Sequence, residues 1–129
     1  MVPNMKLIGL CLSLFLLGAL LACDPPLIVK VTNKTNDELV VYFGRGEPTQ
    51  PYTYYYLVGI ISPGKTADYY TGYLIGDDID FSITAEKNVG QDVIQMGFLP
   101  ASHWDSVTIV YAQSFERKQF KGNPRITIT

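Results

Sequence analysis

The chain has 129 residues and a mass of 14.4 kDa, which is enough for one domain with its own hydrophobic core. Ten basic residues stand against twelve acidic ones. No basic stripe is present to neutralise phosphates, so no nucleic-acid partner is expected. Two cysteines and one histidine are too few for zinc or copper sites of the usual ligand sets, and we expect no cofactor.

The N-terminal segment has the pattern of an export signal. Lys6 precedes an uncharged apolar run over residues 7–22. A run of this length is too short for a transmembrane helix, which needs roughly 20 residues. A positive charge followed by a short apolar run is typical of a signal that is removed from the mature protein. Translation starts at Met1 or at Met5, and either start gives the same mature chain.

The apolar run ends in Leu20-Leu21-Ala22-Cys23. These residues resemble the lipobox of bacterial lipoproteins, in which a small residue precedes a cysteine that becomes lipid-modified. The resemblance implies cleavage between Ala22 and Cys23 and a covalent lipid on Cys23 that anchors the protein in a membrane. Leu21 departs from the pattern, since small or β-branched residues are commoner there. The alternatives are an uncleaved anchor and a plain secretory signal with an incidental cysteine.

The resemblance also implies a location, because such a protein is exported and held at the bacterial membrane by its lipid. In a cell with two membranes, Asp24 resembles the signal that retains a lipoprotein at the periplasmic face of the inner membrane. In a cell with one membrane, the protein lies on the outer face of that membrane. Residues 1–22 are the signal peptide and residues 23–26 are the lipidated cysteine with a short tether. Residues 24–26 reach only about 10 Å when extended, so the domain stays near the membrane.

Residues 27–129 are predicted to form one all-β domain. From residue 23 onward the chain has 29 β-branched and 15 aromatic residues against nine alanines and leucines, which favours strands over helices. Cys11 leaves with the signal, so this domain has no free thiol once Cys23 is lipidated. Apolar and alternating runs between turn signals predict about eight short strands. They cover residues 27–32, 38–43, 53–61, 66–74, 79–86, 92–98, 106–112 and 125–129.

Two hairpins and one half-exposed strand are expected within this order. The first two strands should pair through the turn cluster 33–37, and the next two through residues 62–65, whose Pro-Gly pair suits a type II turn. Residues 79–86 alternate, which predicts one core face and one solvent face. The turn spacing predicts a small antiparallel β-sandwich, immunoglobulin-like or transthyretin-like in outline. A small closed β-barrel is the alternative.

Tyrosine is unusually concentrated, because seven of the nine tyrosines fall between Tyr52 and Tyr73. Exposed tyrosines offer stiff, amphipathic contact area for binding. The candidate binding face consists of Tyr54, Tyr56, Tyr70, Tyr73 and Trp104. Ordinary cross-strand packing of aromatic residues explains the same pattern, and both interpretations stay open.

Two groups of polar residues are candidate sites of chemistry. Asp77, Asp78 and Asp80 form a run that offers oxygen ligands to Ca²⁺, although turn aspartates explain it equally and no metal is expected. His103 has Ser102 and Asp105 close in sequence, but adjacency in sequence does not make a catalytic triad. A polar loop that ends in a core tryptophan accounts for these residues, and the protein is not expected to be an enzyme.

The sequence therefore predicts a non-enzymatic, membrane-anchored envelope lipoprotein. Its domain is expected to dock another envelope protein, as an accessory or assembly subunit. The alternative is a module that binds glycans or peptidoglycan through the tyrosine-rich sheet face.

Overall fold

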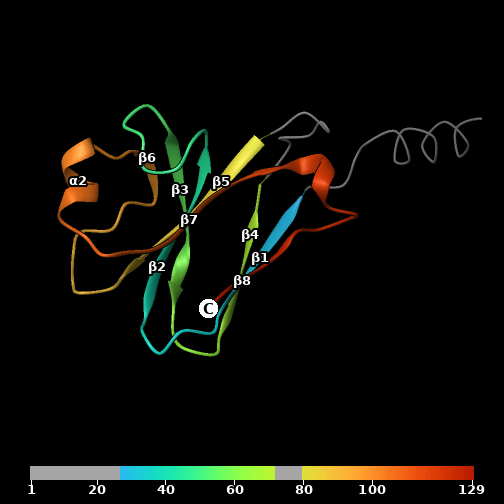
Figure 1. Ribbon diagram of the computed structural model, residues 1–129, viewed down its shortest axis with the longest axis horizontal. Helices are drawn as coiled ribbons and strands as arrows, with labels where there is room; N and C mark the ends of the chain where they lie inside the picture. The colour runs from blue at the N-terminus through green and yellow to red at the C-terminus, as the bar shows by residue number, and fades with distance from the viewer. Residues whose placement is uncertain (1–26, 72–79) are drawn as a thin grey trace, which may run out of the picture.

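The computed structural model describes residues 27–71 and 80–129 (Figure 1). The strands are β1 (Ile28–Asn33), β2 (Leu39–Arg45), β3 (Tyr54–Ile61), β4 (Thr66–Tyr70), β5 (Asp80–Lys87), β6 (Met96–Phe98), β7 (Ile109–Glu116) and β8 (Arg125–Ile128). The helix α2 (Ala101–Asp105) precedes β7, and the 3-10 helix η1 (Arg117–Gln119) follows it. The prediction of an all-β domain with about eight strands is confirmed. Five predicted site residues lie outside the described residues: Ala22, Cys23, Tyr73, Asp77 and Asp78.

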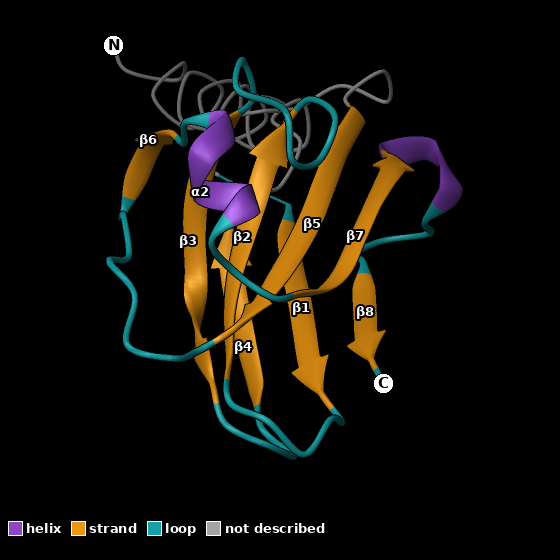
Figure 2. Cartoon of the chain, turned by 60° about the vertical axis from the view of Figure 1, so that its left-hand side comes forward, coloured by secondary structure: helices purple, strands orange, loops and turns teal. Residues whose placement is uncertain are grey.

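The strands form two sheets that pack face to face (Figure 2). One sheet has three strands in the order β4-β1-β8, and the other has five in the order β6-β3-β2-β5-β7. This arrangement is a sandwich, so the alternative of a closed barrel is wrong. All pairs are antiparallel except β1 with β8, which is parallel. Within the described ranges, no helix is long and apolar enough to cross a membrane.

Both predicted hairpins are wrong. β1 pairs with β4 and β8, whereas β2 pairs with β3 and β5. Residues 34–38 therefore carry the chain from the three-stranded to the five-stranded sheet, and residues 62–65 carry it back. The physical reason is that pairing depends on contacts between distant segments, and β2, which is buried at six of its seven residues, lies inside the five-stranded sheet with a strand on each side. The strand β5, far away in sequence, supplies one of them.

The type II turn expected at residues 62–65 is present, although the hairpin is not. The Lys65 amide donates to the Ser62 carbonyl at 3.1 Å, and Gly64 has a φ of 79°. Positive φ at the third turn position is the conformation for which glycine is favoured. Local sequence thus determines this turn, while packing determines which sheet the next strand joins.

The inner core lies between the two sheets. It is built from alternate residues of the facing strands, as expected for a sandwich. Its buried members are Leu27, Val29, Val31, Leu39, Val41, Phe43, Ile61, Phe81, Ile83, Ala85, Ile126 and Ile128. Phe43 stacks on Phe81, with ring centroids 5.3 Å apart, so the largest inward-facing side chains of β2 and β5 meet at the centre.

A second buried layer covers the outer face of the five-stranded sheet. Val40, Tyr42 and Tyr55 point to that side, and Leu99 and Trp104 from the segment around α2 pack onto them. Residues 88–107 therefore cover this face of the sheet, and we call them the cover segment. Ser82, Thr84 and Glu86, on the outer face of β5, are fully buried. The predicted solvent face of this strand is therefore wrong, because α2 and its flanking loops exclude the water.

Asn33 links the two sheets at the end of β1. Its fully buried side chain donates to the carbonyl groups of Asp37 at 2.7 Å and Ile61 at 2.8 Å. Its Oδ1 accepts bonds from the Thr35 amide at 2.9 Å and the Thr35 hydroxyl at 2.6 Å. Since Ile61 ends β3, this one side chain holds the crossing segment against the opposite sheet.

Candidate functional site

The first candidate site is an aromatic face on the strand pair β3–β6. Tyr54 lies opposite Phe98, and Tyr56 lies opposite Met96. Residues directly opposite each other in an antiparallel pair share a face of the sheet, and Tyr56 also lies opposite the core residue Phe43. All four side chains therefore project from the inner face of the five-stranded sheet. We call Tyr54, Tyr56, Met96 and Phe98 the aromatic face.

The aromatic face is only partly covered. The side chains of Met96 and Phe98 are each 62% exposed, and Tyr54 and Tyr56 are half-buried. The ring of Tyr54 contacts Phe98 edge-on, with centroids 5.0 Å apart, and lies 5.1 Å from the ring of Tyr56. A five-stranded sheet that faces a three-stranded one leaves an overhang, and β6 is the strand at this margin. The aromatic face is the inner surface of that overhang.

The aromatic face continues into the core through Tyr69 on β4. Tyr69 lies 6.0 Å from Tyr56 and 5.0 Å from Phe43, measured between ring centroids. Burial, followed by the nearby Tyr56, raises the pKa of Tyr69 to about 12, while Arg45 acts in the opposite direction. The phenol therefore stays neutral at physiological pH and remains available as a hydrogen-bond donor. The aromatic face is therefore continuous with the rings of Tyr69 and Phe43, which lie on strands and not on a loop.

The backbone edge of β6 is also open. β6 has three residues and lies at the end of the five-stranded sheet, and β3 is the strand paired with it in the described part of the chain. Edge strands offer unpaired amide and carbonyl groups that another strand can pair with. Side-chain anchors and backbone groups thus lie next to each other on one margin of the molecule.

The structure divides the predicted tyrosine cluster. Tyr54 and Tyr56 lie together, as the alternation predicts. Tyr70 is 63% exposed on the outer side of the three-stranded sheet, opposite Ile28. Trp104 belongs to the cover segment and is buried against Tyr42. Neither of these two belongs to the aromatic face.

Met96 and Phe98 are functional candidates that sequence reasoning missed. The sequence predicts a strand over 92–98 but does not identify the strand that pairs with it, so the neighbours of its outward residues stay unassigned. The alternation of Met96 and Phe98 about Gly97 is the local signal, and the pairing of β6 with β3 gives it meaning.

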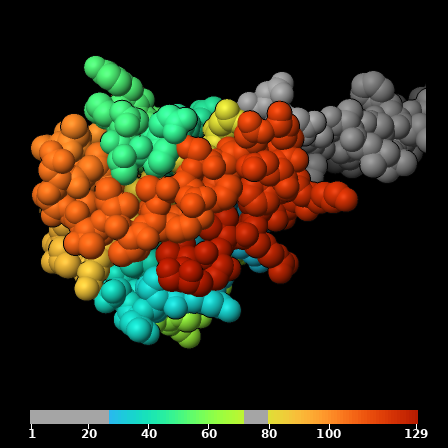
Figure 3. Space-filling view, in the orientation of Figure 1, coloured from blue at the N-terminus to red at the C-terminus, as the bar shows by residue number. Residues whose placement is uncertain are grey.

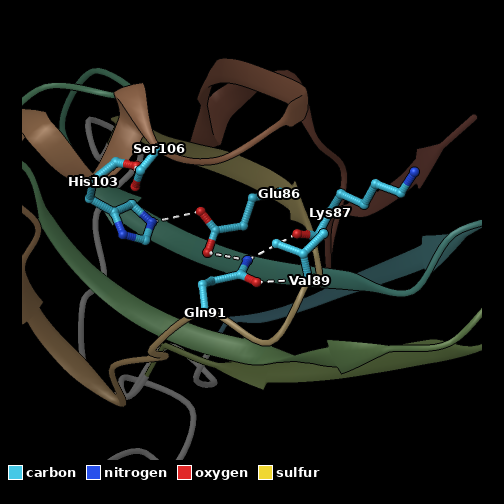
Figure 4. Close-up of polar contacts among 6 residues, drawn as sticks. All are labelled: Glu86, Lys87, Val89, Gln91, His103 and Ser106. Atoms are coloured by element: carbon cyan, nitrogen blue, oxygen red, sulfur yellow. Dashed lines mark hydrogen bonds and ion pairs between the residues drawn. The ribbon is translucent and has the colours of Figure 1, made fainter.

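The second candidate site is a buried pair between β5 and α2 (Figure 4). His103 Nε2 lies 2.6 Å from Glu86 Oε2, with side-chain exposures of 12% and 0%. A carboxylate only accepts, so the imidazole donates from Nε2. Gln91 Nε2 donates to Glu86 Oε1 at 3.1 Å and to the Lys87 carbonyl at 2.9 Å. The pair fastens the cover segment to the sheet.

No catalytic arrangement accompanies this pair among the described residues. Ser102 and Asp105 are exposed, and neither makes a hydrogen bond to the imidazole of His103. The Ser106 hydroxyl donates to the His103 carbonyl at 2.8 Å and not to the ring. The contacts that the structure shows for this pair join β5 to the segment around α2.

The layer around the pair contains further buried polar atoms. The Tyr42 hydroxyl, the Ser82 and Thr84 hydroxyls and the Trp104 indole nitrogen have no hydrogen-bond partner within the described ranges. Burial, followed by the negative charge of Glu86, raises the pKa of Tyr42 to about 12. This outer layer therefore combines apolar side chains with buried polar atoms, in contrast to the apolar inner core.

Asp80 lies beside a cleft of about 500 Å³ at one end of β5 and β7. Its polar lining includes Glu47, Ser114 and Glu116. Ser114 donates to Glu47 at 3.1 Å, and Glu116 pairs with Lys118 at 3.4 Å. In residues 27–71 and 80–129, no group of three or more histidine, cysteine or acidic side chains is arranged to hold a metal ion. Asp77 and Asp78, the other two residues of the predicted Ca²⁺ candidate, lie outside the described residues.

Comparisons with protein-family models, with curated proteins and with solved structures give no match for this chain. The functional argument therefore depends on the chemistry of these two sites.

Proposed function

We propose that the protein is a lipid-anchored envelope lipoprotein without enzymatic activity, which docks a partner protein through the aromatic face. The observation that carries this proposal is the group of exposed apolar side chains, Met96 and Phe98, beside the open edge of β6. The lipobox-like residues that end in Cys23 support the anchor. The isolation of His103 from any nucleophile in the described residues supports a role in binding.

The aromatic face offers enough apolar surface for a specific contact. At 62% exposure, Met96 and Phe98 together leave on the order of 200 Å² for a partner to bury. At about 25 cal/mol per Å², this area corresponds to roughly 5 kcal/mol before the costs of association. Pairing along the backbone of β6 adds hydrogen bonds that fix the register of the partner. Two exposed anchors of this size act as a binding hot spot.

The position of the aromatic face also favours a partner at the membrane. Phe98 and Tyr54 lie at the end of the sandwich where β1 begins, since β2 and β4 both end there. A tether of three residues keeps this end within about 10 Å of a lipid on Cys23. A membrane protein, or another anchored envelope protein, is therefore the partner within reach.

Glycan binding is the second candidate function, and one observation favours it. The half-buried ring of Tyr54 lies against the exposed Phe98 at 5.0 Å, so two rings present surface to solvent, as sugar-binding faces do. This function predicts retention on a peptidoglycan or surface-glycan resin that is lost when Tyr54 and Phe98 are both replaced by alanine. Unchanged retention would remove this alternative.

Photo-crosslinking in living cells tests the docking proposal. A photoreactive amino acid is placed at Tyr54, and the matched control position is Val89, which is 66% exposed but lies beyond the far end of β5. We expect one dominant membrane-protein adduct from position 54 and none from position 89. The adduct should disappear in the Met96→Ser, Phe98→Ser variant and in the unanchored Cys23→Ser variant. Equal adducts from both positions, or an adduct that persists without the apolar anchors, would contradict docking through this face.

A further inference from the structure

We propose that the end of the sandwich where β1 begins rests directly on the lipid surface, with Tyr52 and Tyr70 in the headgroup layer. We call this end the tether end. The inference rests on the proposed lipid anchor at Cys23 and extends it, because it assigns the orientation of the domain and a second contact with the membrane. The contact is made by lipid, independently of any protein on the aromatic face.

Tyr70 lies immediately beside the point where the described chain begins. It is opposite Ile28 in the β1–β4 pair. The next residue, Thr71, donates from its amide and from its hydroxyl to the Leu27 carbonyl, at 2.9 Å and 3.1 Å. Tyr70 is 63% exposed although it is a large aromatic side chain. A bulky exposed ring is thus fixed next to the first residue after the tether.

Tyr52 projects from the same end of the molecule. It belongs to the loop between Arg45, the last residue of β2, and Tyr54, the first residue of β3. This loop protrudes from the surface in the space-filling view, in green at the top of Figure 3. The next residue, Thr53, is buried and its amide donates to the Gln50 carbonyl at 3.2 Å. The loop is therefore anchored, yet Tyr52 remains 90% exposed.

Two exposed tyrosines at the anchored end match the chemistry of a bilayer interface. Tyrosine is enriched there because its ring contacts the acyl boundary while its hydroxyl stays among headgroups and water. The headgroup regions together add about 10–15 Å to a hydrocarbon core of about 30 Å. A tether with a reach of about 10 Å therefore keeps the tether end within or against this layer.

Charge alone does not account for such a contact. The tether end carries exposed Arg45, Lys118 and Lys121, but also the acidic residues Glu47, Asp80 and Glu116. The opposite charges lie close together, as in the pair of Lys118 with Glu116. We therefore expect the contact to depend on the tyrosine rings and to change little with salt.

The opposite end provides a matched control. Val89 is 66% exposed and follows Lys87, which lies opposite Leu39 at the start of β2. This end is the full length of the strands away from the tether end (Figure 1). If exposed apolar surface alone determined contact with lipid, Tyr52 and Val89 would contact the membrane to the same extent. An oriented domain places Tyr52 at the membrane and Val89 away from it.

The test measures depth in reconstituted vesicles. The full-length lipoprotein is produced as Tyr52→Cys, Tyr70→Cys and Val89→Cys variants, labelled with an environment-sensitive fluorophore and placed in phosphatidylethanolamine vesicles containing phosphatidylglycerol. We expect headgroup spin-labelled lipid to quench the probe at 52 and at 70 several-fold more than at 89. Each variant must keep the unfolding midpoint of the parent protein. This result is expected because all three positions are exposed.

The outcomes separate this inference from the proposed function. Mass spectrometry of the intact protein reports the acyl chains on Cys23, and an unmodified cysteine would overturn the lipid anchor itself. With the acyl chains present, equal quenching at 52 and 89 would overturn the orientation while leaving the anchor intact. Loss of quenching at 52 in the Tyr70→Ser background would show that the Tyr70 ring maintains the contact, which supports the inference. Loss of quenching at 52 in high salt would show that charge maintains the contact, which contradicts the inference.

Discussion

Replacing His103 by alanine is expected to destabilise the domain by about 3 kcal/mol at neutral pH. The substitution leaves the fully buried carboxylate of Glu86 with Gln91 as its remaining side-chain donor, at 3.1 Å. Breaking one partner out of a buried pair costs about 3–5 kcal/mol, because the other charge stays buried without compensation. The retained bond from Gln91 places this pair at the lower end of that range. The substitution also removes the edge-on contact between the rings of His103 and Trp104, whose centroids lie 4.8 Å apart.

Urea unfolding followed by tryptophan fluorescence measures this loss. Trp104 is the single tryptophan of the chain. It lies next to His103 in the cover segment and is buried in the outer layer, so its emission reports directly on that layer. The matched controls are Ser102→Ala and Asp105→Asn, which alter exposed neighbours on the same short helix. Both controls should change the free energy of unfolding by less than about 0.5 kcal/mol.

A double-mutant cycle decides whether the pair itself is responsible. Replacing both partners, with Glu86→Gln and His103→Ala, should restore at least about 1 kcal/mol relative to His103→Ala alone, because no buried carboxylate remains. If His103→Ala is as mild as the Ser102→Ala control, or if the cycle gives no coupling energy, the pair does not fasten the cover segment and the reasoning is wrong.

Three further predictions use the same unfolding assay. Since tyrosine in the unfolded chain ionises near pH 10 while Tyr42 stays protonated to about pH 12, stability is complete below pH 10 and falls as pH rises towards 12. The loss is about 2 kcal/mol, and Tyr42→Phe should flatten this alkaline slope. Gly44→Ala places a methyl group against the buried Ser82 hydroxyl and should cost about 1–3 kcal/mol, with partial recovery in the Gly44→Ala, Ser82→Gly variant. Asn33→Ala removes the four hydrogen bonds of a buried side chain, one of them buried and three part-buried, and should cost about 3 kcal/mol, whereas a loss below about 1 kcal/mol would show that the crossing segment is held by other contacts.

The sequence predicts the fold class and the strand positions well because these depend on local patterns. Five of the eight predicted strands agree with the structure to within two residues at each end, whereas β4 ends four residues before the predicted end and β6 begins four residues after the predicted start. The run 106–112 begins three residues before β7 and ends four residues before Glu116. The residues after 113 alternate irregularly between polar and aromatic side chains, so the pattern of 114–121 could not separate the end of β7 from η1.

Strand pairing could not be predicted, because it depends on contacts between distant segments. β2 and β5 carry apolar residues on the inner face, and the same alternation is compatible with several partners.

The burial of the outer layer could not be predicted from the sequence either. Glu86 occupies a position that alternation assigns to solvent, and only the arrival of α2 makes it a buried partner of His103. The interpretation of Trp104 as a core residue is correct, since a single large aromatic after a polar loop is commonly buried.

The two margins of the five-stranded sheet explain why the aromatic face merits a functional interpretation. Any five-stranded sheet opposite a three-stranded one has inner-face residues that the smaller sheet does not cover. At the β7 margin, Phe120 folds back over Phe115 and Phe81, with ring centroids 5.7 Å and 6.1 Å apart. At the β6 margin, Met96 and Phe98 remain 62% exposed with no such cover from the described residues. One chain therefore closes one overhang with its own side chain and leaves the other open, at the end nearest the proposed lipid, which is where a membrane partner would bind.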